Sequence, residues 1–209
     1  MISAGNDIVA LNLVDKQRTL LPAFYLKFIT PAELSLHKES AISFENFIWL
    51  LWSVKESAYK YLKRSDESLV FSPSKLIVQN LSIPAESDRV YLDTDQIVDT
   101  FYDGIVSTGS STIKFRSAIN NQFIATVINE GDVYWGVQAI ADSDYHTQSN
   151  AVRLLALAKL NDIILADDLW IDKHSSGYPF IVNGTHPLRS SISFAHHGCY
   201  VSYAFQLPK

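Results

Sequence analysis

Apolar residues recur with a helical period between Phe44 and Leu62. On a helical wheel, one stripe holds Phe47, Leu51, Val54, Ala58 and Tyr61. This pattern predicts an amphipathic helix with a buried face. The stretch Phe47–Trp52 is apolar all round, so we expect the first half of the helix to be buried on both sides. Glu56 and Lys60 follow one turn apart on the opposite face. As a surface pair they would stabilise the helix by only a few tenths of a kcal/mol, and charges on a largely buried helix need partners.

Shorter elements are predicted before this helix. Ile8–Leu13 is a strand-like apolar run with Asp7 at its head, where an acid is usually a cap or turn residue. Arg18–Phe28 has the spacing of a helix. Thr30-Pro31-Ala32-Glu33 predicts the start of another helix, with threonine as N-cap, proline at the first helical position and Glu33 completing a capping box.

From Ser74 onward the pattern changes to that of strands. The predicted strands are Lys75–Leu81, Val90–Leu92, Thr112–Ser117 and Gln122–Ile128. Asn120-Asn121 predicts a hairpin turn between the last two. The segment Asp93–Ser111 fits no element.

The order strand, helix, strands then recurs. The predicted elements are strands Tyr134–Ile140, Leu169–Asp172, Pro179–Val182, Ser191–Phe194 and Tyr200–Phe205, with a helix at Gln148–Ile163. Gly136–Ile140 aligns with Gly5–Val9. We therefore predict an α+β fold of two similar halves, 1–132 and 133–209, each an antiparallel sheet with a packed helix, related by a pseudo-twofold axis. Because Gln138 stands where Asp7 stands, the copies differ, and one site built across their interface is expected.

Composition restricts the class of protein. The chain has 209 residues, of which 47% are hydrophobic and 19% charged, so it is globular rather than disordered. The net charge of −5 does not support a broad nucleic-acid surface, although a local basic patch remains possible. The single cysteine, Cys199, excludes an internal disulfide and is expected to be a small core residue. No signal-peptide pattern and no bilayer-spanning run is present, which predicts a cytoplasmic protein without a membrane partner.

Three stretches together resemble the 4′-phosphopantetheinyl transferase superfamily. Gly5–Val9 is similar to its Gly-x-Asp-Ile motif, and Trp52–Lys60 to its Trp-x-x-Lys-Glu-[Ala/Ser]-x-x-Lys motif. Gly177-Tyr178-Pro179 and Ser191–His196 resemble its Gly-Lys-Pro and Ile-Ser-x-Ser-His elements. The motif order is similar to that of the small acyl-carrier-protein synthases, whereas the length and duplication resemble the larger single-chain enzymes. The resemblance therefore implies the phosphopantetheinyl transferase fold and a monomer with one active site.

The resemblance also implies an activity of the holo-acyl-carrier-protein synthase type. In this Mg²⁺-dependent reaction, 4′-phosphopantetheine passes from coenzyme A to a serine of an apo acyl or peptidyl carrier protein, and 3′,5′-ADP is released. The implied metal ligands are Asp7 and Glu56, because Mg²⁺ prefers carboxylate oxygens. Lys60 would neutralise a phosphate, and Glu33 matches a position proposed to deprotonate the serine. The implied coenzyme-binding residues are Lys55, Lys60, Arg153, Gly177, Tyr178, Pro179 and His196.

Three positions depart from the family pattern. Val9 stands where the larger enzymes often carry a third acid, and Ala195 replaces a serine. Tyr178 replaces a lysine expected near the coenzyme's 3′-phosphate; the candidates to compensate for it are Lys173, His174 and Arg189. These departures leave open an alternative function, that of a non-catalytic relative with the same fold that binds a carrier protein or nucleotide. Fatty-acid, polyketide and peptide synthesis all remain open as pathways.

The candidate residues also have structural explanations. Glu56 and Lys60 alone would suit a structural pair, and Glu33 alone would suit a capping box. His196 and His197 are adjacent on a predicted strand, so their side chains should point to opposite faces. This argues against a zinc site and leaves His197 as a surface residue.

Overall fold

In the computed structural model, which describes residues 3–85, 92–109, 111–164, 166 and 168–208, five strands form the sheet that carries the first motif. In spatial order they are β1 (Asn6–Ala10), β6 (Phe123–Ile128), β5 (Thr112–Ile119), β4 (Thr100–Ser107) and β2 (Ile77–Ser82). All four pairings are antiparallel. The helices of this half are α1 (Lys16–Thr19), α2 (Pro22–Tyr25), α3 (Pro31–His37) and α4 (Phe44–Lys63), with a 3₁₀ helix η1 at Pro73–Lys75.

The second half contains two sheets and its own helix. Its main sheet contains β11 (Ser191–His197), β12 (Tyr200–Gln206) and β7 (Val133–Ala139), and the short strand β3 (Leu92–Asp93) of the first half joins its edge parallel to β7. A smaller sheet contains β10 (His186–Pro187), β9 (Pro179–Asn183) and β8 (Leu169–Lys173), and the helix is α5 (Tyr145–Ile163). The series β7, β12, β11 corresponds to the series β1, β6, β5. The prediction of an α+β fold with antiparallel sheets is thus confirmed.

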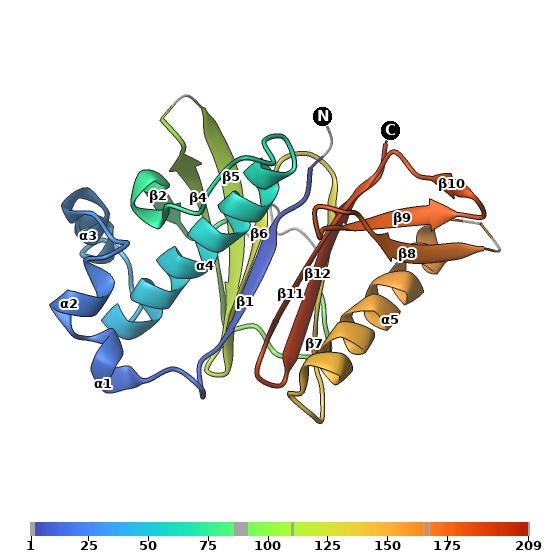
Figure 1. The fold of residues 1–209 in the computed structure, drawn as a ribbon. Coiled ribbons are helices and arrows are strands. Elements are labelled where there is room, and N and C mark those ends of the chain that lie inside the picture. Colours follow the sequence, from blue (N-terminus) through green and yellow to red (C-terminus); the bar gives the residue numbers. More distant parts are fainter. Residues whose placement is uncertain (1–2, 86–91, 110, 165, 167, 209) are drawn as a thin grey trace.

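The apolar stripe of α4 lies on a side of the helix that the structure buries. Ser43 caps the helix by accepting a hydrogen bond from the Asn46 amide. The apolar stripe residues Phe47, Leu51, Val54 and Ala58 are fully buried, and so are Ile48 and Leu50 on other sides of the first half. The helix packs on β1 and β6 (Figure 1). Its N-terminal half is therefore enclosed on several sides, as expected from the sequence.

Gly5 allows β1 to approach α4 closely. A Cβ atom at this position would collide with the carbonyl oxygen of Ser57 and with the backbone of Tyr61. Only glycine fits such a contact between a strand and a helix backbone. The close approach brings Asp7, two residues further along the strand, to the side of α4.

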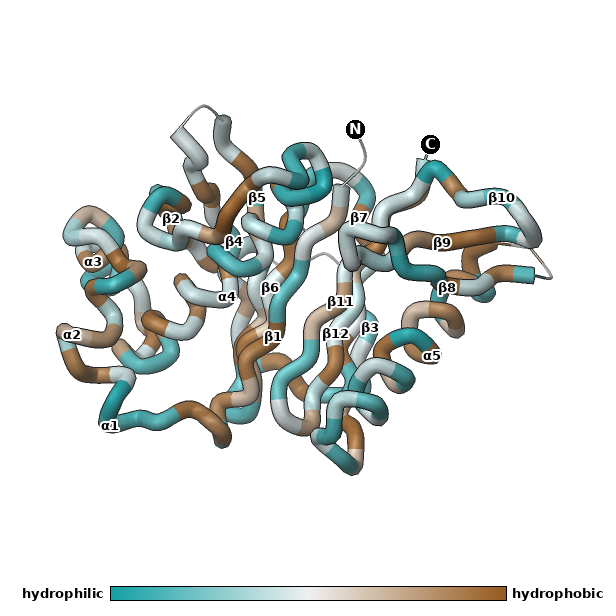
Figure 2. The backbone as a smooth tube through the Cα atoms, viewed as in Figure 1, coloured by the Kyte–Doolittle hydropathy of each residue, from teal (hydrophilic) through white to brown (hydrophobic). Residues whose placement is uncertain are grey.

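One of three clusters of buried apolar residues joins the two halves. One cluster of buried apolar residues lies between α4 and the first sheet, and another between α5 and the second sheet. A third cluster contains members of both halves, among them Ile8, Phe123, Trp135 and Ala204. Strands β1 and β11 lie side by side where the halves meet (Figure 1), and hydrophobic residues line β1 and β9 (Figure 2). No helix in the described part of the chain is long and apolar enough to cross a membrane.

Four details differ from the sequence-based expectation. The single helix predicted at Arg18–Phe28 is wrong, because Pro22 has no amide hydrogen and starts a second short helix instead. The segment that fitted no element contains β4, an interior strand of the first sheet. Of the predicted strand Val90–Leu92, only its last residue lies within the described residues. Cys199 is exposed at the β11–β12 hairpin, so its expected place in the core is wrong.

Candidate active site

Asp7 and Lys60 meet where β1 crosses α4. Lys60 Nζ lies 3.3 Å from Asp7 Oδ1 and donates a second hydrogen bond, of 2.9 Å, to the carbonyl oxygen of Asn6. The two side chains keep 14% and 30% of their surface exposed, Asp7 the smaller part, so both remain open to ligands. Lys60 thus pairs with Asp7 rather than with Glu56, its neighbour one turn earlier.

Glu56 is the second carboxylate of this site, and little positive charge lies near it to neutralise it. Burial raises its pKa first, and the nearby charge of Asp7 raises it further, while Lys60 acts in the opposite direction. Within the described residues nothing donates a hydrogen bond to its carboxylate. Two acids that share one lysine leave room for a further cation, and carboxylate oxygens are the ligands that Mg²⁺ prefers. Asp7 and Glu56 therefore fit the magnesium ion implied by the sequence motifs.

A Mg²⁺ ion here would need ligands beyond protein side chains. Among the described residues, no group of three or more His, Cys, Asp or Glu side chains is arranged to hold a metal ion. Magnesium usually keeps several waters and takes substrate phosphate oxygens beside one or two carboxylates. The acid pair therefore suits an ion that binds together with a phosphate compound.

Two adjoining pockets surround these residues. The first, which we name the carboxylate pocket, has a volume of about 660 Å³ and is lined by Asp7, Glu56, His197 and the aromatic residues Phe24, Phe28, Trp49 and Trp52. The second, the basic pocket, has a volume of about 400 Å³ and is lined on its charged side by Lys60, Lys63, Arg64, Arg153, Lys173 and His196. His196 also lines the carboxylate pocket, so the two pockets meet there.

The basic pocket collects, from both halves of the chain, six of the seven residues predicted to bind the coenzyme, all except Lys55. Helix α4 provides Lys60, α5 provides Arg153, and the loop before β9 provides Gly177 and Tyr178. Five Lys and Arg side chains converge here although the whole chain carries a net charge of −5. Such a local excess of positive charge favours anionic ligands, particularly phosphates.

Lys63 and Arg64 also line the basic pocket, although the sequence motifs did not single them out. In the sequence they were recognisable only as basic residues at the C-terminus of a helix, where they offset the helix dipole. The four-residue spacing from Lys60 to Arg64 is the signal that places the latter on the same side of α4.

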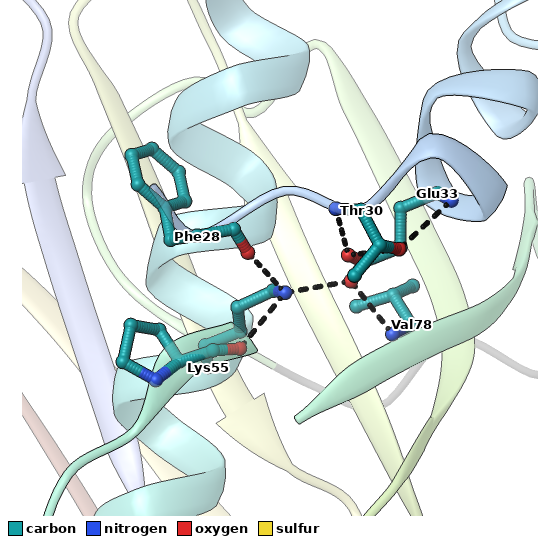
Figure 3. A network of polar contacts seen from close by, with 6 residues as sticks. Phe28, Thr30, Glu33, Lys55 and Val78 are labelled. Atoms are coloured by element: carbon teal, nitrogen blue, oxygen red, sulfur yellow. Dashed lines mark hydrogen bonds and ion pairs between the residues drawn. The ribbon is translucent and has the colours of Figure 1, made fainter. Parts of the chain in front are cut away.

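Glu33 and Lys55 lie inside the core rather than in either pocket. Both side chains are fully buried, and Lys55 Nζ lies 2.7 Å from Glu33 Oε1. Figure 3 shows the polar contacts around this pair. Lys55 also donates hydrogen bonds to the carbonyl oxygens of Phe28, at 2.6 Å, and Pro73, at 3.0 Å. Burial lowers the pKa of Lys55, and the charge of Glu33 opposes this. All three donors of the ammonium group are thus engaged inside the protein.

The Glu33 carboxylate is saturated in the same way. Its Oε2 accepts hydrogen bonds from the Thr30 amide and hydroxyl at 2.8 and 2.9 Å, and Oε1 accepts one from the Val78 amide at 2.9 Å. The Glu33 amide in turn donates a hydrogen bond of 3.3 Å to Thr30 Oγ1, and this bond together with the one from the Thr30 amide forms the predicted capping box. The structure therefore does not bring Glu33 or Lys55 to the other predicted site residues. Position 55 is turned about 100° from position 56 on the helix, which directs Lys55 to the core. The ion pair and its hydrogen bonds anchor α3, β2 and the 3₁₀ helix η1 to α4.

The two adjacent histidines differ in their surroundings. His196 is exposed, and its ring lies edge-on to Tyr145 with ring centres 5.9 Å apart. Partial burial and the charge of Lys60 lower the pKa of His196. His197 is half-buried, and its Nδ1 accepts a hydrogen bond of 3.0 Å from the Ala10 amide. It therefore ties β11 to β1, and the expectation of a mere surface residue is wrong.

The ring of Tyr178 is stacked rather than free. Arg64 Cζ lies 4.2 Å from its centre, and the His174 ring stacks on it with centres 4.4 Å apart and planes 7° from parallel. Of the three residues expected to compensate for the missing lysine, Lys173 lines the basic pocket, His174 supports Tyr178, and Arg189 is not part of the lining. Arg64 is the cation placed directly on the tyrosine.

In metal-free solution, Glu56→Gln is expected to stabilise the protein at neutral pH. The folded state prefers the protonated carboxyl, so the ionised form destabilises the fold once the pH rises above the ordinary glutamate value of 4.5. The gain in melting temperature should therefore disappear in acid. Added Mg²⁺ should raise the melting temperature of the wild type but not of the variant. The control is the exposed Glu39→Gln; a gain that persists below about pH 4, or no gain at neutral pH, would contradict the prediction.

Comparison with protein-family models now identifies the first half. Residues 3–103 match the model of the 4′-phosphopantetheinyl transferase superfamily, so this part of the chain carries a domain of that superfamily. The resemblance predicted from the motifs is thereby confirmed, and a domain of this superfamily implies a transferase. The matched range contains Asp7, Glu56 and Lys60 but ends before α5, so the roles expected for Gly177–Pro179 and His196 stay predictions. Searches among curated proteins and among solved structures found no match.

Proposed function

We propose that this chain transfers 4′-phosphopantetheine from coenzyme A to a serine hydroxyl of an apo acyl or peptidyl carrier protein. The superfamily domain supports phosphopantetheinyl transfer in general. The observation that carries the specific proposal is that two pockets of complementary chemistry share His196 in their linings. One holds the acid pair Asp7 and Glu56, and the other is rich in Lys and Arg. A pyrophosphate with an attached anionic nucleotide suits this combination.

The proposed reaction is an in-line displacement at the phosphorus atom of coenzyme A that carries the pantetheine. The serine oxygen forms a bond to this phosphorus, and the bond to the bridging oxygen breaks, so that 3′,5′-ADP leaves with that oxygen. Mg²⁺ held by Asp7 and Glu56 would supply the charge neutralisation that the pyrophosphate needs. Lys60, fixed by Asp7 and by the Asn6 carbonyl, would orient a phosphate oxygen and offset its charge.

The serine hydroxyl must lose its proton during the reaction, so an acceptor is needed in the carboxylate pocket. Of the three acids singled out in the sequence, Glu33 is fully buried with both oxygens engaged, whereas Asp7 and Glu56 line the carboxylate pocket. The acceptor in this proposal is therefore water or one of these two carboxylates, and Glu33 is left with a structural role.

The coenzyme would bind between residues 1–132 and 133–209. Both segments line the basic pocket, the first through α4 and the second through Arg153, Lys173 and His196. The repeated strand order supports two halves related by a pseudo-twofold axis. Since one chain provides both walls of the pocket, a monomer suffices for activity.

The carrier protein would dock on a surface formed by α1 and α2. Leu13, Leu20, Leu21 and Leu26 are each about half exposed there, next to Lys16, Arg18 and Lys27. Figure 2 shows the hydrophilic α1 next to a hydrophobic stretch at α2. Arg18 and Lys27 also line the carboxylate pocket, so this surface is continuous with the site. Exposed leucines with interleaved positive charges fit an amphipathic acidic helix, which is the kind of surface that an acidic carrier presents.

Reversing two of these charges, Arg18→Glu with Lys27→Glu, is expected to raise KM for the carrier at least about tenfold. The KM for coenzyme A should stay close to the wild-type value, because neither residue lines the basic pocket. Raising the salt concentration should increase the KM for the carrier more in the wild type than in the variant. Lys114→Glu, which reverses an exposed charge on β5, serves as the control. An unchanged KM for the carrier would show that docking occurs elsewhere.

The proposed function is tested by the intact mass of purified apo carriers incubated with this protein, coenzyme A and Mg²⁺. Carriers from fatty-acid, polyketide and peptide synthesis should be compared. A gain of one phosphopantetheine unit on one of them would support the transferase and indicate its pathway. No gain despite measurable coenzyme A binding would favour a non-catalytic relative that retains the fold, and no gain without binding would contradict both functions.

A further inference from the structure

One residue joins the metal-side helix to the second half of the chain at the basic pocket. Arg64 caps the C-terminus of α4, and its Nη2 donates hydrogen bonds to the carbonyl oxygens of Pro179, at 3.0 Å, and Ile192. Pro179 begins β9, and Ile192 lies in β11. A single guanidinium group therefore links the first half to two strands of the second.

The same guanidinium group also holds the turn that precedes β9. It lies over the Tyr178 ring, and His174, at the other end of the turn, stacks on that ring. Gly177 has a φ of 92°, a left-handed conformation that glycine adopts without strain, so the turn itself is tight. Burial lowers the pKa of Arg64 to about 10, which leaves the group charged at neutral pH.

The position of this turn relative to α4 depends on side-chain contacts. The sheet of β8, β9 and β10 is separate from the sheet of β11 and β12, so no shared ladder fixes it to the remainder of the second half. A further contact with the first half is an exposed hydrogen bond of 2.8 Å from Ser176 Oγ to Glu67 Oε2. The partly buried contacts of Arg64 are less open to competition from water.

Arg64 lies on the same side of α4 as the residues of the metal-side site. Glu56, Lys60 and Arg64 follow one another at steps of four residues, so a span of roughly 12 Å of rigid helix separates the first from the last. The carboxylate end of the cleft and the turn Gly177–Pro179 are thus positioned by one element. A shift of the turn would change the distance between Gly177–Pro179 and the acid pair Asp7 and Glu56.

We propose that Arg64 is a positioning residue that holds the turn Gly177–Pro179 against α4 and so keeps the basic pocket preformed for coenzyme A. The kinetic part of this inference rests on the proposed function. Arg64 places a cation on Tyr178, the residue that stands where the family pattern has a lysine. Its planar group makes two hydrogen bonds and one stacking contact, which a lysine does not reproduce.

The test compares Arg64→Gln, Arg64→Lys and Tyr178→Leu with the control Arg189→Gln, which removes an exposed arginine outside the pocket. Arg64→Gln is expected to raise KM for coenzyme A about tenfold or more, with kcat and KM for the carrier nearly unchanged, because preorganisation is lost. Arg64→Lys should show most of this effect despite its charge, and Tyr178→Leu a smaller one. Hydrogen exchange of amides 173–183 should accelerate in the same order without any ligand.

Two readouts separate this inference from the proposed function. If the wild type modifies no carrier, the proposed function fails, while faster exchange in the Arg64 variants still supports the positioning of the turn. If exchange of amides 173–183 is unchanged in all three variants, the inference is wrong. A wild-type KM for coenzyme A in Arg64→Lys would show that charge alone suffices and would also overturn it. Tyr178→Leu keeps the test valid if the Arg64 variants fail to fold.

Discussion

Asp7→Asn is expected to reduce carrier modification at least about 10³-fold, which corresponds to about 4 kcal/mol of transition-state stabilisation. The amide keeps the shape of the side chain but removes one of the two charged oxygen donors proposed for Mg²⁺. It also removes the ion pair in which Lys60 Nζ lies 3.3 Å from Asp7 Oδ1. Both effects fall on groups that would contact the pyrophosphate, so the loss should lie in kcat and in the Mg²⁺ dependence.

The fold should survive this substitution. The Asp7 side chain is partly exposed, and Lys60 keeps its hydrogen bond to the Asn6 carbonyl. The measurement is single-turnover transfer over a range of Mg²⁺ concentrations, with circular dichroism to verify folding. Asp99→Asn removes an equal charge from an exposed position outside both pockets and should behave as the wild type. A folded Asp7→Asn protein within tenfold of the wild-type rate would exclude Asp7 from the metal site.

Lys55→Met is expected to lower the free energy of unfolding by about 3–5 kcal/mol. The substitution leaves the Glu33 carboxylate charged and fully buried without its partner at 2.7 Å. It also leaves the carbonyl oxygens of Phe28 and Pro73 without the donors that they have in the folded protein. Breaking a buried pair by removing one partner is costly because the remaining charge stays desolvated.

Urea unfolding of the single and double variants measures this effect. The double variant Lys55→Met with Glu33→Gln should recover part of the lost stability, because no unpaired charge remains. The exposed Lys75→Met should change stability by less than about 0.5 kcal/mol. At a temperature where Lys55→Met is still folded, its transfer rate should be close to that of the wild type, since Lys55 lines neither pocket. A loss of activity without a loss of stability would restore Lys55 to the catalytic site.

Local sequence patterns predicted an element correctly where a regular apolar period or a capping motif was present. The 3.6-residue period of α4 and the Thr30–Glu33 capping box are both present in the structure. The helix predicted at Arg18–Phe28 failed because the apolar spacing was weighed above Pro22, which has to begin a new helix. Strand β4 was missed because Gly104 and the polar residues of the segment Asp93–Ser111 weaken the apolar pattern of a strand. The hydrogen bonds of β4 come from β2 and β5, which the local sequence does not show.

The candidate site likewise contains residues that the sequence motifs placed correctly and residues that they did not. The motifs predicted that Asp7, Glu56 and Lys60 belong together, and the close approach at Gly5 brings them to one cleft. They also suggested that Lys55 and Glu33 act there, but a motif contains no information on which way each side chain points. Arg64 was overlooked because its partners are backbone carbonyls more than 100 residues away.

The sequence by itself determined the α+β fold class, the superfamily of residues 3–103 and the meeting of Asp7 and Glu56 in one pocket. These properties follow from local periodicity, from capping chemistry and from short motifs whose residues are near neighbours in the chain. The tertiary structure alone decided that Glu33 and Lys55 form a buried ion pair in the core, that His197 ties β11 to β1, and that Arg64 contacts the turn before β9. These contacts depend on burial and join segments that are distant in the chain. Those of His197 and Arg64 form only when the two halves pack together.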